Sequence, residues 1–375
     1  MRAYLSLLSV SLALLFSCHG SHPQGGVAEG NHYARGFSLL DSGGYTRVRV
    51  SNPWGQARNI VMEYYLVPEE DPVPSHLDGK TVIRTPVDRI ICMSTSHLAF
   101  LEALGETGKI TGVSGRGYIT SPRVLKRLEE GLAVDVGYGQ NLNFEEIIRQ
   151  QPGMVMLYGV DSEIAGFLGK FRDLGIPAVV NAEYLEDTPL GKAEWIRFTG
   201  AFLDREETAD SLFRATEERY LSLQALSGSV RENPEVMVGL PYRDTWWIPG
   251  GNSYMARLIS DAGGSFAGRE NASRESVVIS MEEAIGLSAH ASLWINTGNV
   301  TTKEEILASD SRLASLPAFA KARIYNNNRH ATPAGGNDFW ESGTVRSDLI
   351  LEDLIRIFHP GLLPPGELNY YREVL

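Results

Sequence analysis

Apolar and polar positions follow two different periods along the chain, and the change of period divides it into parts. Within residues 32–86, short alternating runs are separated by turn signals. The stretch "FSLLDSGGYTRVRV" is typical of a β-hairpin, and Pro53 and Pro68 mark further turns. From Val87 onward, short continuous apolar runs alternate with stretches of helical spacing, which indicates parallel strands covered by helices on both faces. We predict a small antiparallel β extension at residues 32–86, followed by α/β structure.

The strand and helix patterns occur in two groups. In residues 87–188 the expected strands are "RIICM", "KITGVSG", "GMVMLYG" and "PAVVN", and the helices between them are "SHLAFLEALGE", "NFEEIIRQQP" and "AGFLGKFRDLG". In residues 230–375 the strands "EVMVGL", "ASLWIN" and "ARIYN" alternate with the helices "SYMARLISDAGG", "MEEAIGLS" and "DLILEDLIRIFHP". The sequence therefore predicts two similar Rossmann-like α/β lobes with parallel sheets.

The segment between the two groups, residues 189–229, has a different pattern. Apolar residues recur at helical spacing, and no proline follows Pro189 up to Leu226. We predict one long α-helix of roughly 50 Å that joins the lobes. The alternative is a pair of ordinary helices broken near Gly200. Two joined lobes leave a cleft between them, and ligands of open α/β sheets bind at the carboxyl ends of the strands.

An acidic helix start occurs in each lobe, in "NFEEIIRQQPGMVMLYG" and in "SMEEAIGLSAHASLWINTG". The first residue of each is a good N-cap, so Glu146 and Glu283 fall where a capping box places its glutamate. Glu145 and Glu282 lie one residue earlier and are not needed for that bond. They either favour the positive end of the helix dipole, worth about 0.3–1 kcal/mol each, or form a two-point docking surface for a pseudo-symmetric partner that carries arginines.

The N-terminus has the pattern of an export signal. Residues 1–17 combine Arg2 with the apolar run "LSLLSVSLALLF", which is too short to span a bilayer. The following "LFSC" resembles a lipoprotein cleavage box, which would make Cys18 the lipidated residue; the alternative is a plain signal peptide with a chance cysteine. Residues 18–31 then form a flexible tether. The other cysteine, Cys92, lies in an apolar run, so we expect no disulfide.

Composition excludes some classes of protein. A chain of 375 residues with 43% hydrophobic and 21% charged residues is typical of a soluble globular protein, and a net charge of −12 disfavours nucleic-acid binding. The chain has no G-x-S-x-G, G-x-x-x-x-G-K-[ST] or H-E-x-x-H motif, so we expect no catalytic residues and no cofactor. The eight histidines are scattered, which disfavours capture of a bare metal ion. An enzyme and a structural lipoprotein remain the alternatives from other classes.

Candidate ligand-binding residues follow the predicted strands and combine aromatic rings with arginines and polar groups. They are Ser94, Ser96, His97, Arg116, Tyr118, Tyr158, Tyr242, Arg243, Trp246, Trp247, Arg329, His330, Asn337, Phe339 and Trp340. Rings stack on a bulky ligand, and guanidinium groups bind its carboxylate or catecholate oxygens. For each aromatic residue, core packing is the alternative. The adjacent tryptophans in "TWW" cannot both enter one core, so at least one should face the cleft or solvent.

Several motifs together resemble a known family. They are "RIICMSTSHLAFLEALGETGKITGVSG", "DVGYGQNLNFEEIIRQQPGMVMLYG", "PGGNSYMARLISDAGG", "ISMEEAIGLSAHASLWINTG" and "RSDLILEDLIRIFHP". In order and spacing, from Val87 to Pro360, they are similar to class III periplasmic binding proteins, the substrate-binding proteins of ABC importers for ferric siderophores, haem and cobalamin. The β extension lies outside this resemblance. It either covers an exposed sheet edge or contacts a second partner.

The resemblance implies a function for the whole chain. It implies a monomeric lipoprotein of the bacterial periplasm, held at a membrane through Cys18, that binds an iron complex (ferric siderophore or haem), with cobalamin as the alternative. It also implies that Glu145 and Glu282 dock to arginines of the dimeric ABC permease, which works with its ATPase. No metal ion is expected to bind the protein directly. Because a continuous helix resists bending, we expect only modest opening and closing.

Overall fold

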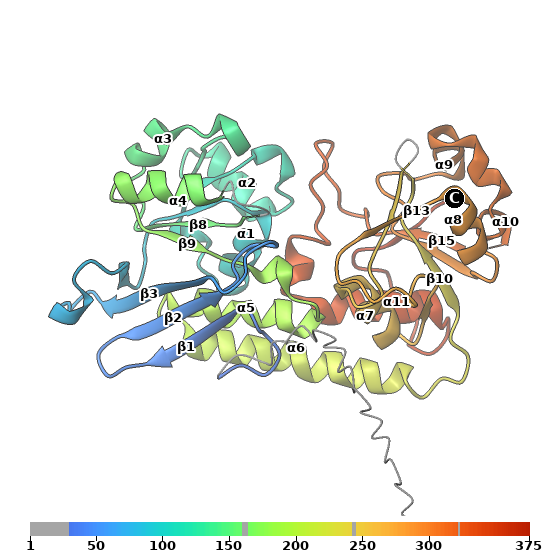
Figure 1. The fold of residues 1–375 in the computed structure, drawn as a ribbon, viewed down its shortest axis with the longest axis horizontal. Coiled ribbons are helices and arrows are strands. Elements are labelled where there is room, and N and C mark those ends of the chain that lie inside the picture. The colour runs from blue at the N-terminus through green and yellow to red at the C-terminus, as the bar shows by residue number, and fades with distance from the viewer. Residues whose placement is uncertain (1–29, 160–163, 242–244, 322) are drawn as a thin grey trace, which may run out of the picture.

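The computed structural model describes residues 30–159, 164–241, 245–321 and 323–375. Two α/β lobes lie side by side, with the β extension against the first of them (Figure 1). The predicted fold class, two lobes with parallel sheets and an N-terminal β extension, is confirmed. None of the described helices combines the length and the apolar composition needed to cross a bilayer.

The N-terminal lobe is built on a five-stranded, fully parallel sheet in the order β7-β6-β5-β8-β9. Its strands are β5 (Ile90–Cys92), β6 (Ile110–Val113), β7 (Val134–Asp135), β8 (Met154–Leu157) and β9 (Ala178–Val180), and its helices are α1 (Thr95–Ala103), α2 (Pro122–Glu129), α3 (Phe144–Arg149) and α4 (Ile164–Asp173). Every residue of β5, β6 and β8 is buried, as expected for strands covered on both faces.

The C-terminal lobe repeats this plan in the order β12-β10-β14-β15-β16, with only the edge strand β16 antiparallel. Its strands are β10 (Glu235–Val238), β12 (Ser265–Phe266), β14 (Leu293–Ile295), β15 (Arg323–Asn326) and β16 (Arg372–Glu373), and its helices are α7 (Tyr254–Asp261), α8 (Met281–Leu287), α9 (Lys303–Ser309), α10 (Pro317–Lys321) and α11 (Ser347–Phe358). Strands β11 (Trp246–Ile248) and β13 (Val277–Ile279) form a separate antiparallel ribbon.

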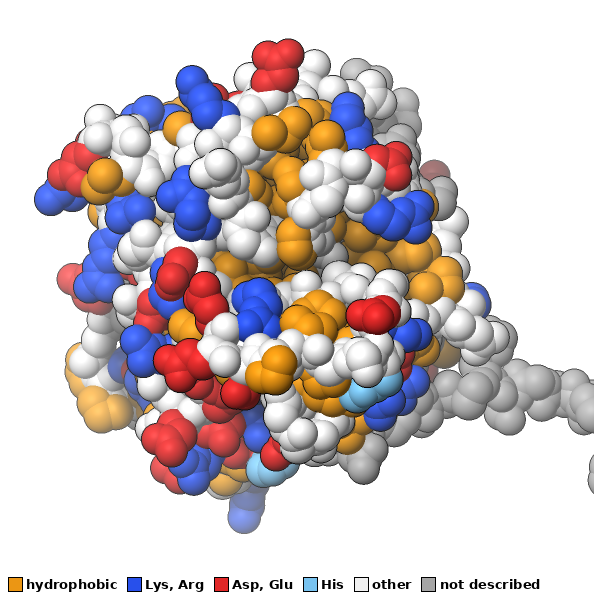
Figure 2. Space-filling model, turned by 90° about the vertical axis from the view of Figure 1, so that its left-hand side faces the viewer, with side chains coloured by type: hydrophobic (Ala, Val, Ile, Leu, Met, Phe, Trp, Pro, Cys, Tyr) orange, Lys and Arg blue, Asp and Glu red, His pale blue; other side chains and the backbone are white. Residues whose placement is uncertain are grey.

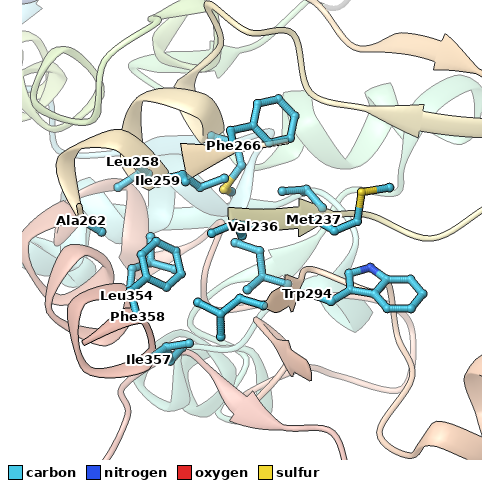
Figure 3. Close-up of a cluster of buried hydrophobic side chains, with 14 of the residues drawn as sticks. Val236, Met237, Leu258, Ile259, Ala262, Phe266, Trp294, Leu354, Ile357 and Phe358 are labelled. Carbon is cyan, nitrogen blue, oxygen red and sulfur yellow. The ribbon is translucent and has the colours of Figure 1, made fainter. Parts of the chain in front are cut away.

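The core of the C-terminal lobe lies between its sheet and the helices α7 and α11. Val236 and Trp294 from the sheet, Ile259 from α7, and Leu354 and Phe358 from α11 belong to one cluster of buried side chains (Figure 3). Fully burying a side chain of this kind stabilises a fold by about 1.5–3 kcal/mol. This lobe therefore has a hydrophobic core of its own.

The connector between the lobes differs in part from the prediction. Residues 189–229 do not form one helix: α5 (Pro189–Ala201) ends after Gly200, and the long helix that joins the lobes is α6 (Glu206–Ser227). The broken alternative is therefore the correct one. A Cβ on Gly200 would come within 2.8 Å of the Ala209 side chain, so glycine lets the two helices pack closely at the break.

Helix α6 links the two hydrophobic cores. Ala209 and Phe213 from its first half belong to the N-terminal core, whereas Tyr220 and Leu223 from its second half belong to the C-terminal core. Its 22 residues give a length of about 33 Å, shorter than predicted. In Figure 1 the helix runs beneath both lobes. A single helix therefore connects the lobes, as predicted, but it begins later in the chain.

The β extension completes the N-terminal lobe. Its strands are β1 (Phe37–Asp41), β2 (Thr46–Ser51), β3 (Val61–Pro68) and β4 (Val82–Thr85), with β1, β2 and β3 antiparallel and β4 parallel to β3. The Tyr64 hydroxyl accepts a hydrogen bond of 2.9 Å from the backbone N–H of Val180, on the edge strand β9. Through this contact the extension lies against an edge of the sheet, one of its two suggested roles.

The face at the left of Figure 1 carries acidic side chains below a strip of exposed apolar ones (Figure 2).

The chain enters this fold through a segment whose backbone is held by two buried carboxylates. The Glu194 carboxylate accepts hydrogen bonds of 2.7–2.8 Å from the backbone N–H groups of residues 32–34. The Glu186 carboxylate accepts bonds of 2.9 Å from the N–H groups of residues 35 and 36, and one of 3.0 Å from the Trp195 indole. Five consecutive N–H groups therefore bind to side chains on or next to α5.

The two cysteines differ in what the structure says of them. Cys18 lies outside the described residues, and Cys92 is buried and free.

Candidate functional site

Tyrosines lie beyond the carboxyl ends of four strands of the N-terminal sheet. They are Tyr118 after β6, Tyr138 after β7, Tyr158 after β8 and Tyr184 after β9, which we call the tyrosine cluster. The four strands are parallel, so their carboxyl ends meet at one edge of the sheet. This is the edge at which open α/β sheets bind ligands.

Three members of the tyrosine cluster, Tyr118, Tyr138 and Tyr158, form a chain of contacts. The Tyr118 and Tyr138 ring centroids are 5.3 Å apart, and the hydroxyls of Tyr138 and Tyr158 lie 3.5 Å apart. Burial raises the pKa of Tyr158, and its hydrogen bond with Tyr138 raises this pKa further, so the phenol stays neutral. The Tyr184 hydroxyl donates to the backbone carbonyl of Gly159. Flat rings with neutral hydroxyls can stack on a ligand and also donate hydrogen bonds to it.

A second group of side chains lies where the two lobes meet α5. The ammonium of Lys192, on α5, is 4.6 Å from the ring centroid of Tyr254 and 5.8 Å from that of Trp340. Both rings belong to the C-terminal lobe. Burial lowers the pKa of Lys192, and the charges of Glu183 and Glu186 oppose that effect. Helix α5 thus carries a buried amine against two aromatic rings of the opposite lobe.

Two further segments bridge the lobes. Residues 331–337 form a hairpin closed by a bridge between Ala331 and Asn337, which we call the interlobe hairpin. It rises between the lobes in Figure 1, and its Thr332 hydroxyl donates to the Gly117 carbonyl at 2.6 Å. Just after it, the buried Glu341 carboxylate accepts from the backbone N–H groups that precede α2, those of Thr120 at 2.8 Å and Ser121 at 2.9 Å. A carboxylate side chain of the C-terminal lobe therefore binds the start of a helix in the N-terminal lobe.

The Glu341 contact should make stability depend on pH. Burial raises the pKa of this carboxyl to about 7 from 4.5, with Asp338 adding to the rise and the N–H groups of Thr120 and Ser121 opposing it. The Glu341 carboxyl therefore holds its proton more tightly in the folded protein than in the unfolded chain. Its contribution to the free energy of unfolding is fully present below the unfolded pKa of 4.5 and is lost as the pH rises through about 7. Between about pH 5 and pH 8 we expect the free energy of unfolding to fall by about 2–3 kcal/mol more in the wild type than in Glu341→Gln. Urea unfolding at each pH measures this, and equal slopes would contradict it.

Several predicted ligand residues lie in the interior. Trp246 and Phe339 belong to the C-terminal core, where Trp246 stacks on Trp294 with centroids 6.0 Å apart. His97 is buried within α1, and burial lowers its pKa to about 3, so the imidazole is neutral. Trp246 and Phe339 therefore lie in the core, which was the alternative given for the aromatic residues, and His97 lies in the interior as well. Ser96 is also buried, with its hydroxyl 2.9 Å from that of Ser94.

Other predicted residues are exposed. Trp247 has 56% of its surface exposed on the ribbon strand β11, so one of the adjacent tryptophans faces solvent, as expected. Trp340 and Tyr118 are exposed as well. Arg116 is exposed, with a guanidinium nitrogen 3.6 Å from the Glu129 carboxylate. Tyr242 and Arg243 were also predicted to bind ligand, but they lie outside the described residues.

Arg329 and His330 line a separate cavity of about 390 Å³ in the C-terminal lobe. One guanidinium nitrogen of Arg329 donates to the Glu367 carboxylate at 2.7 Å, and another donates to the Leu368 carbonyl. These contacts tie Arg329 to the C-terminal segment of the chain, and the tyrosine cluster does not line this cavity. In the part of the chain that the structure describes, no three His, Cys, Asp or Glu side chains gather to hold a metal ion.

The two acidic helix starts have equivalent places in the two lobes. Helix α3 precedes β8 in one sheet, and α8 precedes β14 in the other. Glu145 and Glu282 are exposed, one on each lobe. The N-cap side chains accept from the backbone N–H groups of Glu146 and Glu283 as predicted, but the Glu146 carboxylate bonds to the Gln150 amide at 2.7 Å rather than closing a capping box.

The sequence interpretation missed part of this arrangement. Tyr138 and Tyr184 follow strands in "VDVGY" and "PAVVNAEY", so a search for aromatics after every strand would have found them. Lys192, Tyr254 and Glu183 carried no such signal. Lys192 and Tyr254 lie on α-helices and Glu183 begins a short 3-10 helix, and only the packing of the lobes brings the three together.

Comparisons with known proteins agree with the architecture. The model of the periplasmic binding protein family matches residues 90–328. An uncharacterized lipoprotein of Methanocaldococcus jannaschii is 27% identical over 324 residues, which cover 82% of this chain and 75% of the relative. Among solved structures, a possible iron-binding periplasmic solute-binding protein of Staphylococcus epidermidis aligns with a TM-score of 0.58 and 19% identity, over 73% of this chain and 100% of that one. The apo periplasmic haem-binding protein of Roseiflexus sp. RS-1 aligns with a TM-score of 0.55 and 20% identity, over 74% and 99%.

Proposed function

Because the chain belongs to the periplasmic binding protein family, we propose that it binds an iron complex, a ferric siderophore or haem, between its lobes and delivers it to an ABC permease. The tyrosine cluster is the observation that carries this proposal. Its rings offer stacking surface for a bulky chelate, and its neutral hydroxyls donate to acceptor oxygens on the ligand. Structural neighbours described as iron-binding and haem-binding support the choice of ligand class.

The rest of the cycle follows from the same proposal. A lipid on Cys18 holds the protein at a membrane, facing the periplasm, and lipoprotein relatives support this assignment. Glu145 and Glu282 dock to arginines on the two halves of the permease, one from each lobe. Transport then needs no chemistry on the ligand, so the protein acts as a carrier and not as an enzyme.

The tyrosine cluster should determine affinity. We expect the double variant Tyr138→Phe/Tyr158→Phe to bind its iron chelate about tenfold more weakly or worse, because each lost hydroxyl removes a hydrogen bond worth about 0.5–1.5 kcal/mol. Quenching of tryptophan fluorescence measures this during titration with haemin, a ferric hydroxamate, a ferric catecholate and cobalamin.

The matched control is Tyr45→Phe. The Tyr45 hydroxyl lies 3.3 Å from the His76 ring in the β extension, so this variant loses a similar contact outside the proposed site. Its affinity should equal that of the wild type. Unchanged affinity in the double variant, or a wild-type protein that binds cobalamin and none of the iron chelates, would contradict the proposal.

A further inference from the structure

Lys192 is an amine with no fixed partner in a largely buried place. The residue is only 9% exposed, and within the described residues its ammonium has no hydrogen bond or ion pair with any side chain. The oxygens of Glu186 are occupied by the backbone N–H groups of Arg35 and Gly36 and by Trp195. Glu183 acts on the lysine only through its charge, and one of its carboxylate oxygens is buried without a partner.

The surroundings offset only part of the cost of this burial. An unpaired ammonium inside a protein costs several kcal/mol. Contact with aromatic faces returns about 0.5–2 kcal/mol, and here the rings of Tyr254 and Trp340 supply it. A buried cation that is stacked but not hydrogen-bonded is poised to bind an anion that enters beside it.

The position of the lysine joins the proposed ligand site. Glu183, whose charge acts on Lys192, directly precedes Tyr184 of the tyrosine cluster. Trp340, one of the two rings near the ammonium, remains 47% exposed. A ligand that stacks on the tyrosine cluster and reaches towards Trp340 would therefore bring its edge to the ammonium.

We infer that Lys192, framed by Tyr254 and Trp340, binds an anionic substituent of the ligand, so that the protein selects iron chelates that carry a free carboxylate. This inference rests on the proposed function and narrows its ligand class. Lys192 lies on α5 and not on the strand-end loops of either lobe, so this helix determines the preference for charged ligands. A neutral corrinoid or an uncharged hydroxamate chelate would leave the ammonium unpaired and should bind more weakly.

The test compares ligands of one shape and different charge. The pairs are haemin with its dimethyl ester, and a carboxylate-bearing ferric hydroxamate with its methyl ester. We expect the wild type to bind the acid of at least one pair about ten- to a hundredfold more tightly than the ester, the range for a hydrogen bond to a charged group. Lys192→Met should remove this difference, and Lys192→Arg should retain most of it.

Lys170→Met is the matched control. The Lys170 ammonium lies 3.7 Å from the centroid of the Phe144 ring, so this variant also loses a cation–π contact, but on the exposed helix α4. It should keep the wild-type preference. Thermal unfolding of the ligand-free variants gives a second readout: Lys192→Met should be no less stable than the wild type, whereas a lysine that only serves as a structural partner of Glu183 would leave it less stable.

The outcomes separate the inference from the function on which it rests. If the wild type binds iron chelates but shows no preference for the acid in either pair, or if Lys192→Met keeps the preference, the inference is wrong and the iron-chelate function stands. If the wild type binds none of the iron chelates, the proposed function fails and the inference fails with it.

Discussion

Glu194→Ala is expected to lower the free energy of unfolding by about 3–5 kcal/mol, a large share of the stability of a typical domain. The Glu194 carboxylate is fully buried, accepts three consecutive backbone N–H groups from residues 32–34, and lies 3.2 Å from a guanidinium nitrogen of Arg197. Removing it leaves the three backbone donors without their acceptor. Arg197 loses one contact and keeps those with the Asp210 carboxylate and the Gly30 carbonyl. Urea unfolding at neutral pH measures the loss.

Two further variants make this result specific. Glu194→Gln keeps an oxygen that can accept but loses the charge, so its loss should be smaller. Glu218→Ala removes an exposed carboxylate from the middle of α6 and should change stability by less than about 0.5 kcal/mol. If Glu194→Ala unfolds like Glu218→Ala, the N-terminal segment contributes nothing to the stability of the fold.

The C-terminal end of the chain is held in the same way. The buried Asp353 carboxylate, on α11, accepts from the backbone N–H groups of Asn369 and Tyr370 at 2.7 Å each, and of Tyr371 at 3.2 Å. Each end of the described chain is thus tied to a helix by a buried carboxylate that binds consecutive N–H groups. No sequence pattern indicates this, because the partners lie 16–18 residues apart at one end and 160–162 at the other.

The local parts of the fold could be predicted because periodicity and caps are properties of short segments. The strand "GMVMLYG" and the helix "NFEEIIRQQP" both formed as β8 and α3, and Asn143 caps the helix. The connector was harder. The apolar spacing continues through residues 198–213, but α5 ends at Ala201 and Asp204 adopts a left-handed φ of 57° before α6 begins. The apolar spacing alone did not distinguish one long helix from two helices broken near Gly200.

The candidate site could be predicted only in outline. The rule that ligands bind at strand ends led to Tyr118 and Tyr158, and it would have led to Tyr138 and Tyr184. The same rule also selected Trp246, which the structure places in the core. A strand-end position does not say which way a side chain points, and that depends on packing between elements.

Reversing both exposed glutamates, Glu145→Arg with Glu282→Arg, should abolish stimulation of the importer's ATPase by the loaded protein. Breaking one buried charge pair at an interface costs about 2–5 kcal/mol, and reversal adds repulsion. Breaking both pairs therefore costs at least about 4 kcal/mol in total, which weakens docking by about a thousandfold or more. The measurement is ATPase activity of the cognate permease in liposomes, across a range of binding-protein concentrations.

The helices that carry these glutamates favour docking over a purely local role. Each presents an exposed isoleucine three residues after its glutamate, Ile148 with 47% of its surface exposed and Ile285 with 37%. Residues three apart share one face of a helix, so each lobe presents a carboxylate beside an apolar side chain. A helix-dipole role alone explains the carboxylate but not the exposed isoleucine, whereas an arginine beside an apolar surface on each half of the permease accounts for both.

Controls distinguish docking from damage to the fold. Glu283→Arg reverses the next residue of α8, which is also exposed and in the first turn, and therefore carries the same helix-dipole cost of about 0.3–1 kcal/mol. It should stimulate the ATPase nearly as well as the wild type. The double reversal should retain wild-type affinity for the iron chelate, and each single reversal should raise the concentration needed for half-maximal stimulation. Full stimulation by the double variant would remove Glu145 and Glu282 from the docking surface, and a matching loss of chelate affinity would make them ligand residues instead.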